Sequence, residues 1–234
     1  MKRLLTFLVI AAMLIPALDT SAQVISEKAK RKFTVGADIF TDLWQVQNTS
    51  PYVPSTFDTR TVNQGAAAFF MYNFLFGESL SAFSVGLAIR NHNLYSNSII
   101  EDIKADTIAY SLVADYLSGG GDYRRSKVNL TYLDLPLELK LRSQSGFKLV
   151  VGFKVGYLID SKQKYVGDRP GDYKSVKEKE KKINRLEKWS YGVTLRVGYK
   201  WITVYSYYQF SKLFQQGVGP EIFPVSLGIT IAPF

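Results

Sequence analysis

The 234-residue chain contains no cysteine and a single histidine, His92. Without cysteine the protein has no disulfide, no thiolate metal ligand and no cysteine nucleophile, and one histidine excludes a multi-histidine metal cluster. The chain also lacks repeated apolar runs of the roughly 20 residues that a membrane-spanning helix needs, and its mean hydropathy is −0.02. These absences exclude cysteine-based catalysis and a polytopic helical membrane protein. Tyrosine and phenylalanine, by contrast, are abundant, with 15 of each.

The one apolar run lies at the N-terminus. Lys2 and Arg3 precede the apolar stretch from Leu4 to Ala17, and a segment of small residues ends at Ala22. A basic start, a short apolar run and small residues at its end describe a secretory signal peptide. We therefore predict cleavage after Ala22, which leaves residues 23–234 as one outer-membrane domain. A transmembrane anchor is the alternative, but the run is shorter than the roughly 20 residues of a spanning helix.

The remainder of the chain alternates apolar and polar residues with a period of two. In VNLTYLDLPLELKLR, residues 128–142, the leucines at odd positions from Leu133 to Leu141 share one face, and Asp134 and Glu138 lie on the other. Because successive side chains of a strand point to opposite faces, this segment has one apolar and one charged side. Pro136 cannot donate to a sheet ladder, so we expect a local bulge there, with the ring on the charged side.

Eight segments have this strand character. They are residues 33–46, 64–76, 80–95, 128–142, 147–160, 188–200, 202–214 and 223–234, of which the second and seventh alternate poorly. Long and short connections alternate between them, which is typical of transmembrane barrels with long extracellular loops and short periplasmic turns. We therefore predict an all-β fold: a closed eight-stranded antiparallel transmembrane β-barrel in the cell outer membrane, with both termini in the periplasm.

Aromatic residues lie near the ends of the predicted strands, as the interfacial girdles of such a barrel require. They are Phe33, Trp44, Phe76, Phe147, Trp189, Trp201 and Phe223. The final residue, Phe234, is expected to be the recognition signal for the barrel assembly machinery. The alternative architecture is a soluble lipocalin-like ligand-binding barrel, which would turn its apolar faces inward around a ligand cavity.

With the apolar faces on lipid, charged side chains collect in the barrel interior. We predict a polar network there formed by Asp38, Asp42, Arg90, Asp134, Glu138, Lys140, Arg142, Lys148, Lys154 and Arg196, joined by Asp160 and Lys200. Eight strands leave an interior just wide enough for side chains to fill. The network is therefore expected to be a salt-bridged plug without a conducting pore.

The predicted loop at residues 161–188 is strongly basic. Its central cations are Lys174, Lys177, Lys179, Lys181, Lys182 and Arg185, and the stretch SVKEKEKKINRLEKW within it could form a short exposed helix. One interpretation is contact with outer-leaflet phosphates or with an acidic partner. The other is a solvated loop of mixed charge. Nucleic acid is not expected as a ligand of a surface loop on a secreted chain.

His92 is the only candidate for catalysis. It is predicted near the outward end of its strand, close in sequence to Ser96, Ser98 and Asp102, and some small outer-membrane barrels are lipid-modifying enzymes with such residues at the rim. No motif places a serine against this histidine and no nucleophile elbow occurs. We therefore expect a protein that is not an enzyme, with no catalytic residues, no cofactor and no metal.

Three segments resemble one known family. YLDLPLELK (residues 132–140) resembles the YLEIPLLLK-type strand of PorT-like outer-membrane barrel proteins, and GFKVGYLIDSK (152–162) and YGVTLRVGYKW (191–201) resemble that family's next two strands. The sequence departs from the family at Asp134 and Glu138, both of which keep the alternation. The resemblance implies an integral outer-membrane barrel that acts through extracellular loops or as an accessory of a protein secretion assembly. The expected partners are outer-membrane lipid, the barrel assembly machinery and secretion-system proteins.

Overall fold

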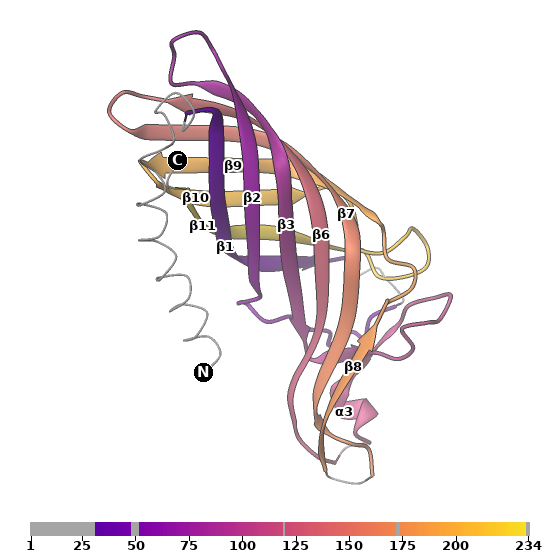
Figure 1. Cartoon of the computed structure of the whole chain (residues 1–234). Coiled ribbons are helices and arrows are strands. Elements are labelled where there is room, and N and C mark those ends of the chain that lie inside the picture. Colours follow the sequence, from indigo (N-terminus) through magenta and orange to yellow (C-terminus); the bar gives the residue numbers. More distant parts are fainter. Residues whose placement is uncertain (1–30, 48–51, 119, 172–173, 233–234) are drawn as a thin grey trace.

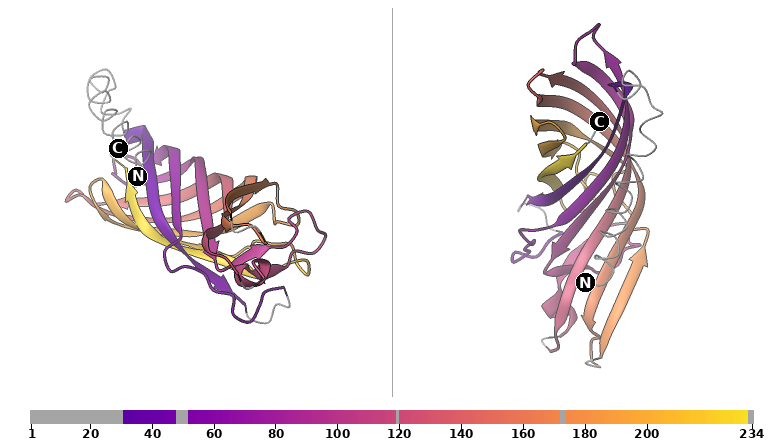
Figure 2. Two further views of the ribbon diagram at one scale, coloured as in Figure 1. Left: turned by 90° about the horizontal axis from the view of Figure 1, so that it is seen from below. Right: turned by 60° about the vertical axis from the view of Figure 1, so that its left-hand side comes forward.

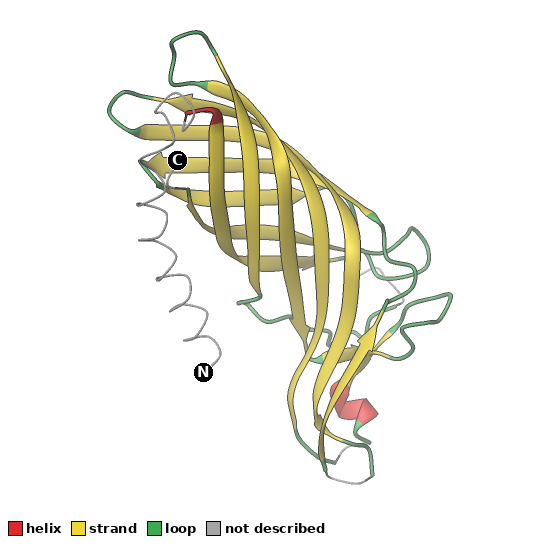
Figure 3. Cartoon of the chain, in the orientation of Figure 1, coloured by secondary structure: helices red, strands yellow, loops and turns green. Residues whose placement is uncertain are grey.

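Eight antiparallel strands close into a barrel (Figures 1 and 3). The computed structural model describes residues 31–47, 52–118, 120–171 and 174–232. The barrel strands are β1 (Phe33–Val46), β2 (Gln64–Leu75), β3 (Ala82–Ser96), β6 (Tyr123–Arg142), β7 (Phe147–Asp168), β9 (Trp189–Tyr199), β10 (Ile202–Gln209) and β11 (Ile222–Ile231). Their order is β6-β3-β2-β1-β11-β10-β9-β7, and pairing of β7 with β6 closes the ring. The predicted fold is confirmed. The predicted cleavage site at Ala22 and the terminal Phe234 lie outside the described residues.

The strands point alternate side chains into the barrel and leave the others on its outer wall. In β9, Tyr191, Val193 and Leu195 are exposed, whereas the residues between them are buried. β2 and β10, which alternate poorly in sequence, also point alternate side chains inward. In β2, for example, Phe69 is buried and Phe70 is exposed. The apolar faces thus lie outside, and the lipocalin-like alternative, which needs them inside, is wrong.

Exposed aromatic side chains gather at both ends of the outer wall. At one end they are Phe33, Phe74, Phe83, Phe147, Tyr199 and Trp201, and at the other Tyr157, Trp189, Tyr191, Tyr208 and Phe210. Two such bands are what the headgroup regions on either side of a bilayer require. The predicted girdle position of Trp44 is wrong, because Trp44 shares the inward parity of β1 and is 6% exposed. Its Nε1 donates a hydrogen bond to the carbonyl of Asn93 at 3.1 Å.

The connections differ between the two ends of the barrel, as Figure 2 shows. At the end where β1 begins and β11 finishes, short turns join β2 to β3, β6 to β7 and β9 to β10. The β6–β7 turn places Gly146 at φ +96°, a conformation that favours glycine, and its N–H donates to the carbonyl of Ser143 at 3.0 Å. We call this the turn end. The long connections gather at the opposite end, which we call the loop end.

The loop end is closed by an apolar cluster. Strand residues that line the mouth of the barrel pack there against side chains from the long connections. The buried members are Trp44, Leu94, Ile100, Ile103, Ile108, Tyr110, Val128, Leu130, Tyr132, Ile183, Leu186, Leu213, Phe214 and Ile222. These side chains come from three of the four long connections, and Val53 and Phe57 of the fourth, between β1 and β2, pack against them. The loops are therefore folded into the barrel mouth rather than extended away from it. No helix among residues 31–47, 52–118, 120–171 and 174–232 is long and apolar enough to cross a membrane.

The sheet continues past the barrel on one side, where β6 and β7 are longer than the sequence predicts. The additional length of β7 pairs with β8 (Ser175–Lys181), in the segment for which we expected a helix. That expectation is wrong, because lysine and glutamate alternate there with the period of a strand. The hairpin of β4 (Ser98–Ile100) with β5 (Tyr110–Leu112) and helix α3 (Val113–Tyr116) cover one face of this extension through Ile99, Val113, Leu117 and Tyr165. We call the extension with β4, β5 and α3 the cap; Figure 1 shows it below the barrel.

A β-bulge separates the barrel part of β7 from the cap. Thr131 of β6 pairs with Asp160, and the next residue, Tyr132, pairs with Leu158, so that Ile159 has no partner. The extra residue reverses the side-chain parity of β7, because each strand residue changes face relative to the one before it. Odd-numbered residues of β7 therefore point outward in the barrel and inward in the cap. This is why Gln163 and Tyr165 are buried beneath β4 and α3.

Pro136 needs no bulge. It faces the lumen, as expected, and pairs with Lys154 of β7 in unbroken register. On its other side, the ladder between β3 and β6 is interrupted. Val85 pairs with Leu137 and Ala88 pairs with Asp134, but the two residues between them on each strand have no partners. Pro136 lacks an N–H group and lies in this gap, so no ladder hydrogen bond from it is needed. Because each strand has the same number of unpaired residues, the register is the same on both sides of the gap.

Candidate functional site

The inside of the barrel holds two groups of ion pairs. The first lies toward the turn end around Arg196 of β9, whose guanidinium donates to Asp38 of β1 at 3.0 Å and to Glu138 of β6. Thr230 donates to the same Asp38 carboxylate at 2.6 Å. Lys140 lies 3.9 Å from Glu138 and donates to the side chain of Asn73 at 3.1 Å. Both carboxylates are therefore held by Arg196.

The second group lies toward the loop end around Arg90 of β3. Its guanidinium forms two parallel hydrogen bonds with Asp134 of β6, at 2.7 and 2.9 Å, which is the bidentate geometry of a strong pair. Lys154 of β7 lies 3.8 Å from the same carboxylate. Gly156 leaves the space for this pair, because a Cβ atom there would lie 2.1 Å from Asp134 Oδ1.

His92 belongs to this second group and not to a rim site. Its Nε2 lies 2.7 Å from an Arg90 nitrogen and its Nδ1 lies 2.7 Å from Asp42 of β1. A guanidinium can only donate, so Nε2 accepts and Nδ1 carries the proton that is donated to Asp42. Ser226 donates to the other Asp42 oxygen at 2.6 Å. The expected position of His92 beside Ser96 and Ser98 at the rim is wrong, because its side chain points into the lumen with both ring nitrogens occupied.

The structure brings eight of the predicted lumen residues together inside the barrel. They are Asp38, Asp42, Arg90, Asp134, Glu138, Lys140, Lys154 and Arg196, none more than 5% exposed. Four carboxylates thus face four cations. Arg142 and Lys148 lie half-buried at the mouth of the turn end, beside a cavity of about 30 Å³. The predictions for Asp160 and Lys200 are wrong: Asp160 follows the bulge and pairs with Lys162 outside the lumen, and Lys200 is exposed in a turn.

Sequence reasoning missed the aromatic rings that separate the ion pairs. The Arg90 guanidinium lies 4.9 Å from the ring of Tyr132 and 4.8 Å from that of Tyr207. The Arg196 guanidinium lies 5.1 Å from Phe69 and 5.0 Å from Tyr205. Cations stacked on ring faces are stabilised by the ring quadrupole, the more so when water is excluded. Tyr132 shares the inward parity of Asp134, so its position follows from the alternation of β6. Phe69, Tyr205 and Tyr207 lie in the two strands that alternate poorly in sequence, where parity alone does not say which aromatic residues point inward.

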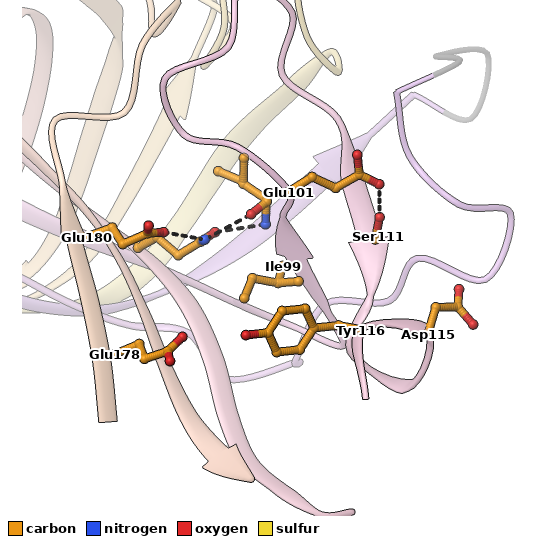
Figure 4. Close-up of a pocket in the computed structure, with 9 residues that line it drawn as sticks. Ile99, Glu101, Ser111, Asp115, Tyr116, Glu178 and Glu180 are labelled. Carbon is orange, nitrogen blue, oxygen red and sulfur yellow. Dashed lines mark hydrogen bonds between the residues drawn. The ribbon is translucent and has the colours of Figure 1, made fainter. Parts of the chain in front are cut away.

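The cap contains a second candidate site, a cleft of about 370 Å³ (Figure 4). Four carboxylates line it: Glu101, Asp115, Glu178 and Glu180. Its other lining residues are Ile99, Ile100, Ser111, Tyr116 and Gln163, so that no basic side chain contributes to the wall. Gln163 is fixed in place by hydrogen bonds to the backbone of Ile100, at 2.8 and 3.0 Å.

The negative field of the cleft acts on Tyr116. Burial, and then the nearby Glu178 carboxylate, raise the pKa of this phenol above its ordinary value. Ser111 donates a hydrogen bond to Glu101, and Arg169 lies 3.8 Å from Glu178 at the edge. The cleft therefore combines an apolar floor with an acidic wall, which suits a ligand or protein segment that carries positive charge.

The predicted basic residues divide among three places. Lys177, Lys179 and Lys181 lie on the outer face of β8, opposite the carboxylates of the cleft. Lys174 is exposed just before β8. Lys182 and Arg185 follow it with positive φ values of 62° and 57°, and Arg185 pairs with Asp106. The alternation of β8 thus sorts lysine to one face of the cap and glutamate to the other.

The sequence matches a known protein family. A family described as "Outer membrane protein beta-barrel domain" matches residues 45–215, more than half of the 234-residue chain. No curated protein matches the sequence. Among the residues that the structure describes, no group of three or more histidine, aspartate or glutamate side chains could hold a metal ion.

Proposed function

Because the chain belongs to the outer membrane protein beta-barrel domain family, we propose that this integral outer-membrane barrel is not an enzyme and acts through its extracellular part, as an accessory of a protein secretion assembly. In barrels of this kind the long loops face the outside of the cell, so the loop end and the cap are extracellular. The resemblance of residues 132–140 to a strand of PorT-like proteins supports the link to secretion.

The observation that carries the proposal is the contrast between a filled lumen and a structured cap. Paired charges and aromatic rings occupy the barrel, and an apolar cluster covers its loop end. A barrel filled in this way offers no path for solutes. The cap, in contrast, has its own apolar cluster and a cleft open to the outside. Binding of a partner in the cleft is therefore the activity that the geometry supports best.

The chemistry of the cleft indicates the kind of partner. Four carboxylates around an apolar floor are complementary to a basic segment with one or two apolar side chains. Tyr116 adds a ring face and a hydroxyl on which such a segment can pack. We propose that an exposed basic segment of a secretion-system protein binds here.

A deletion strain complemented with variants tests the proposal. We expect deletion to abolish the appearance of secreted cargo in the medium, and Glu178→Gln combined with Glu180→Gln to reduce it strongly while the barrel remains in the outer membrane. Asp58→Asn with Glu78→Gln removes the same charge from exposed positions away from the cleft and serves as the matched control. Unchanged secretion after complete deletion would refute the accessory role.

Planar bilayers test the filled lumen directly. Refolded protein is expected to show no stable ohmic conductance, since buried side chains fill the barrel interior. Reproducible single-channel steps would contradict the proposal and indicate a pore.

A further inference from the structure

The outer face of the cap carries a second, oppositely charged surface. The register of three strands places Lys127 of β6, Lys164 of β7 and Lys179 of β8 in one row. The row on one side contains Arg125 and Lys177, and the row on the other contains Lys162 and Lys181. We call these seven residues the basic face.

Like charges placed directly opposite one another on neighbouring strands destabilise a sheet. The carboxylates of β8 do not relieve this repulsion, because Glu178 and Glu180 point to the cleft on the other side. Within the described residues, only Lys162 of the seven forms an ion pair, with Asp160, and Arg125 Nε is buried without a hydrogen-bond partner. The face thus has an excess of positive charge that the protein itself does not balance.

Neighbouring cations affect the protonation of Lys164, which lies at the centre of the basic face. Burial and the nearby Arg125, Lys177 and Lys127 lower the pKa of its ammonium group. The environment disfavours the charged form, as expected where cations are crowded with no anion among them. A bound anion would reverse that effect.

The position of the basic face relative to the lipid-facing wall identifies the anion. Leu133 and Leu135 on the outer wall of β6 have the same parity as Lys127 and Arg125, so the basic face is the continuation of the surface that contacts lipid. On β7, Ile159 of the outer wall is 50% exposed. Lys162 lies three residues further along the strand, or about 10 Å at the rise of a strand. A surface at that height beside an outer leaflet faces headgroups.

We propose that the basic face binds the phosphate groups of anionic lipid headgroups in the outer leaflet, and so fixes the cap against the membrane surface. The site goes beyond the proposed partner function, because it lies on the face of β8 opposite the cleft. The rows of lysines present several ammonium groups to the phosphates, and Arg125 adds a cation at the edge. The cap then stands between lipid on one face and the partner on the other.

Native mass spectrometry of the full chain in detergent micelles, with bisphosphorylated lipid A as the probe, tests the proposal. A lysine near an anionic lipid surface contributes enough that Lys164→Gln with Lys179→Gln should weaken binding about 30-fold. Lys164→Arg with Lys179→Arg keeps the charge and should bind as the wild type does. Lys32→Gln with Lys200→Gln removes two exposed lysines at the turn end and is the matched control. Heat-modifiable gel mobility verifies that each variant is folded.

Four outcomes would overturn the proposal. Equal binding by the glutamine variant would show that the lysines are not involved, and equal binding of dephosphorylated lipid A would show that apolar contact suffices. Displacement of lipid A by inorganic phosphate at the same concentration as lipid A would indicate a site for free phosphate. Displacement by an acidic peptide at that concentration would indicate a docking surface for protein. Loss of binding in the glutamine variant alone, with secretion unaffected, would support lipid binding even where the partner function fails.

Discussion

The lumen and the basic face share two strands, β6 and β7, yet their charges are arranged in opposite ways. In the lumen, buried carboxylates and cations are equal in number and joined by short hydrogen bonds. On the basic face, half-exposed cations of one sign stand in rows without matching anions. Buried charges must be paired, because removing one partner leaves an uncompensated ion in a medium that solvates it poorly. Exposed charges are solvated by water, so they can remain without a protein partner and are accessible to a ligand of opposite charge.

The largest expected effect comes from unbalancing the lumen. Arg196→Met leaves Asp38 and Glu138 buried without their common cation, so we expect a loss of about 3–5 kcal/mol in the free energy of unfolding. Urea titration of the barrel refolded into vesicles measures it. Adding Asp38→Asn and Glu138→Gln to the variant should restore most of the loss. If Arg196→Met alone is as stable as the wild type, the lumen ion pairs do not hold the barrel together.

The next effect tests how the two regions are kept apart. Deleting Ile159 removes the unpaired residue, so that Leu158 and Asp160 become neighbours opposite Tyr132 and Thr131 and the side chains of the cap keep their faces. The cap should then stay folded and resist limited proteolysis, with the heat-modifiable mobility of the barrel unchanged. Deleting Val151, a paired residue of the same strand, shifts the register of β7 and is the contrasting variant, in which both properties should be lost. Cleavage of the cap after deletion of Ile159 would show that the cap depends on the bulge residue itself.

The two faces of the cap sheet should also respond differently to high pH. Burial raises the pKa of Tyr165, on the inner face of β7, to about 12. A raised folded-state pKa gives stability that is complete below the ordinary value near 10 and is lost as the pH rises toward 12. We expect cap protection, measured by protease resistance, to fall across that window in the wild type and to fall less in Tyr165→Phe. The same fall in both would assign the pH dependence to another group.

The smallest effect should have the opposite sign to the first. Lys164→Gln removes a cation from the centre of the basic face, so without lipid A it should stabilise the cap by about 0.2–1 kcal/mol through relief of cross-strand repulsion. Hydrogen exchange of the β7 and β8 amides measures this change. Destabilisation would show that Lys164 has a partner in the folded protein and would weaken the contrast with the lumen.

The barrel was predictable from the sequence because lipid requires apolar residues at every second position of each strand. Leucines at odd positions from Leu133 to Leu141, set against Asp134 and Glu138, identify both the strand and its inward face. The same count finds most of the interior charges. It gives no pairing, because Arg196 meets Asp38 across 158 residues of sequence through the curvature of the closed barrel.

The cap was not predictable in the same way, and β8 shows why. Lysine and glutamate have good helix propensity, and SVKEKEK contains only one apolar residue to indicate a strand. Pairing with β7 and packing of Val176 against the cluster around Tyr165 decide the outcome. The bulge at Ile159 has no sequence signal, since the apolar alternation of β7 includes Ile159 itself, and the bulge alone displaces Asp160 from the interior.

The long-range pairing of the lumen has a consequence for the order of assembly. Asp38 and Asp42, both on the first strand, bond to Thr230 and Ser226 on the last, 192 and 184 residues further along the chain. During synthesis and transport these carboxylates emerge long before their partners exist. The carboxylates of Asp38 and Asp42 must remain hydrated until β1 pairs with β11. In a barrel that is still open at this seam between the first and last strands, water must therefore have access to both carboxylates. Closure of the seam is therefore the step at which both carboxylates can leave water for the interior of the barrel.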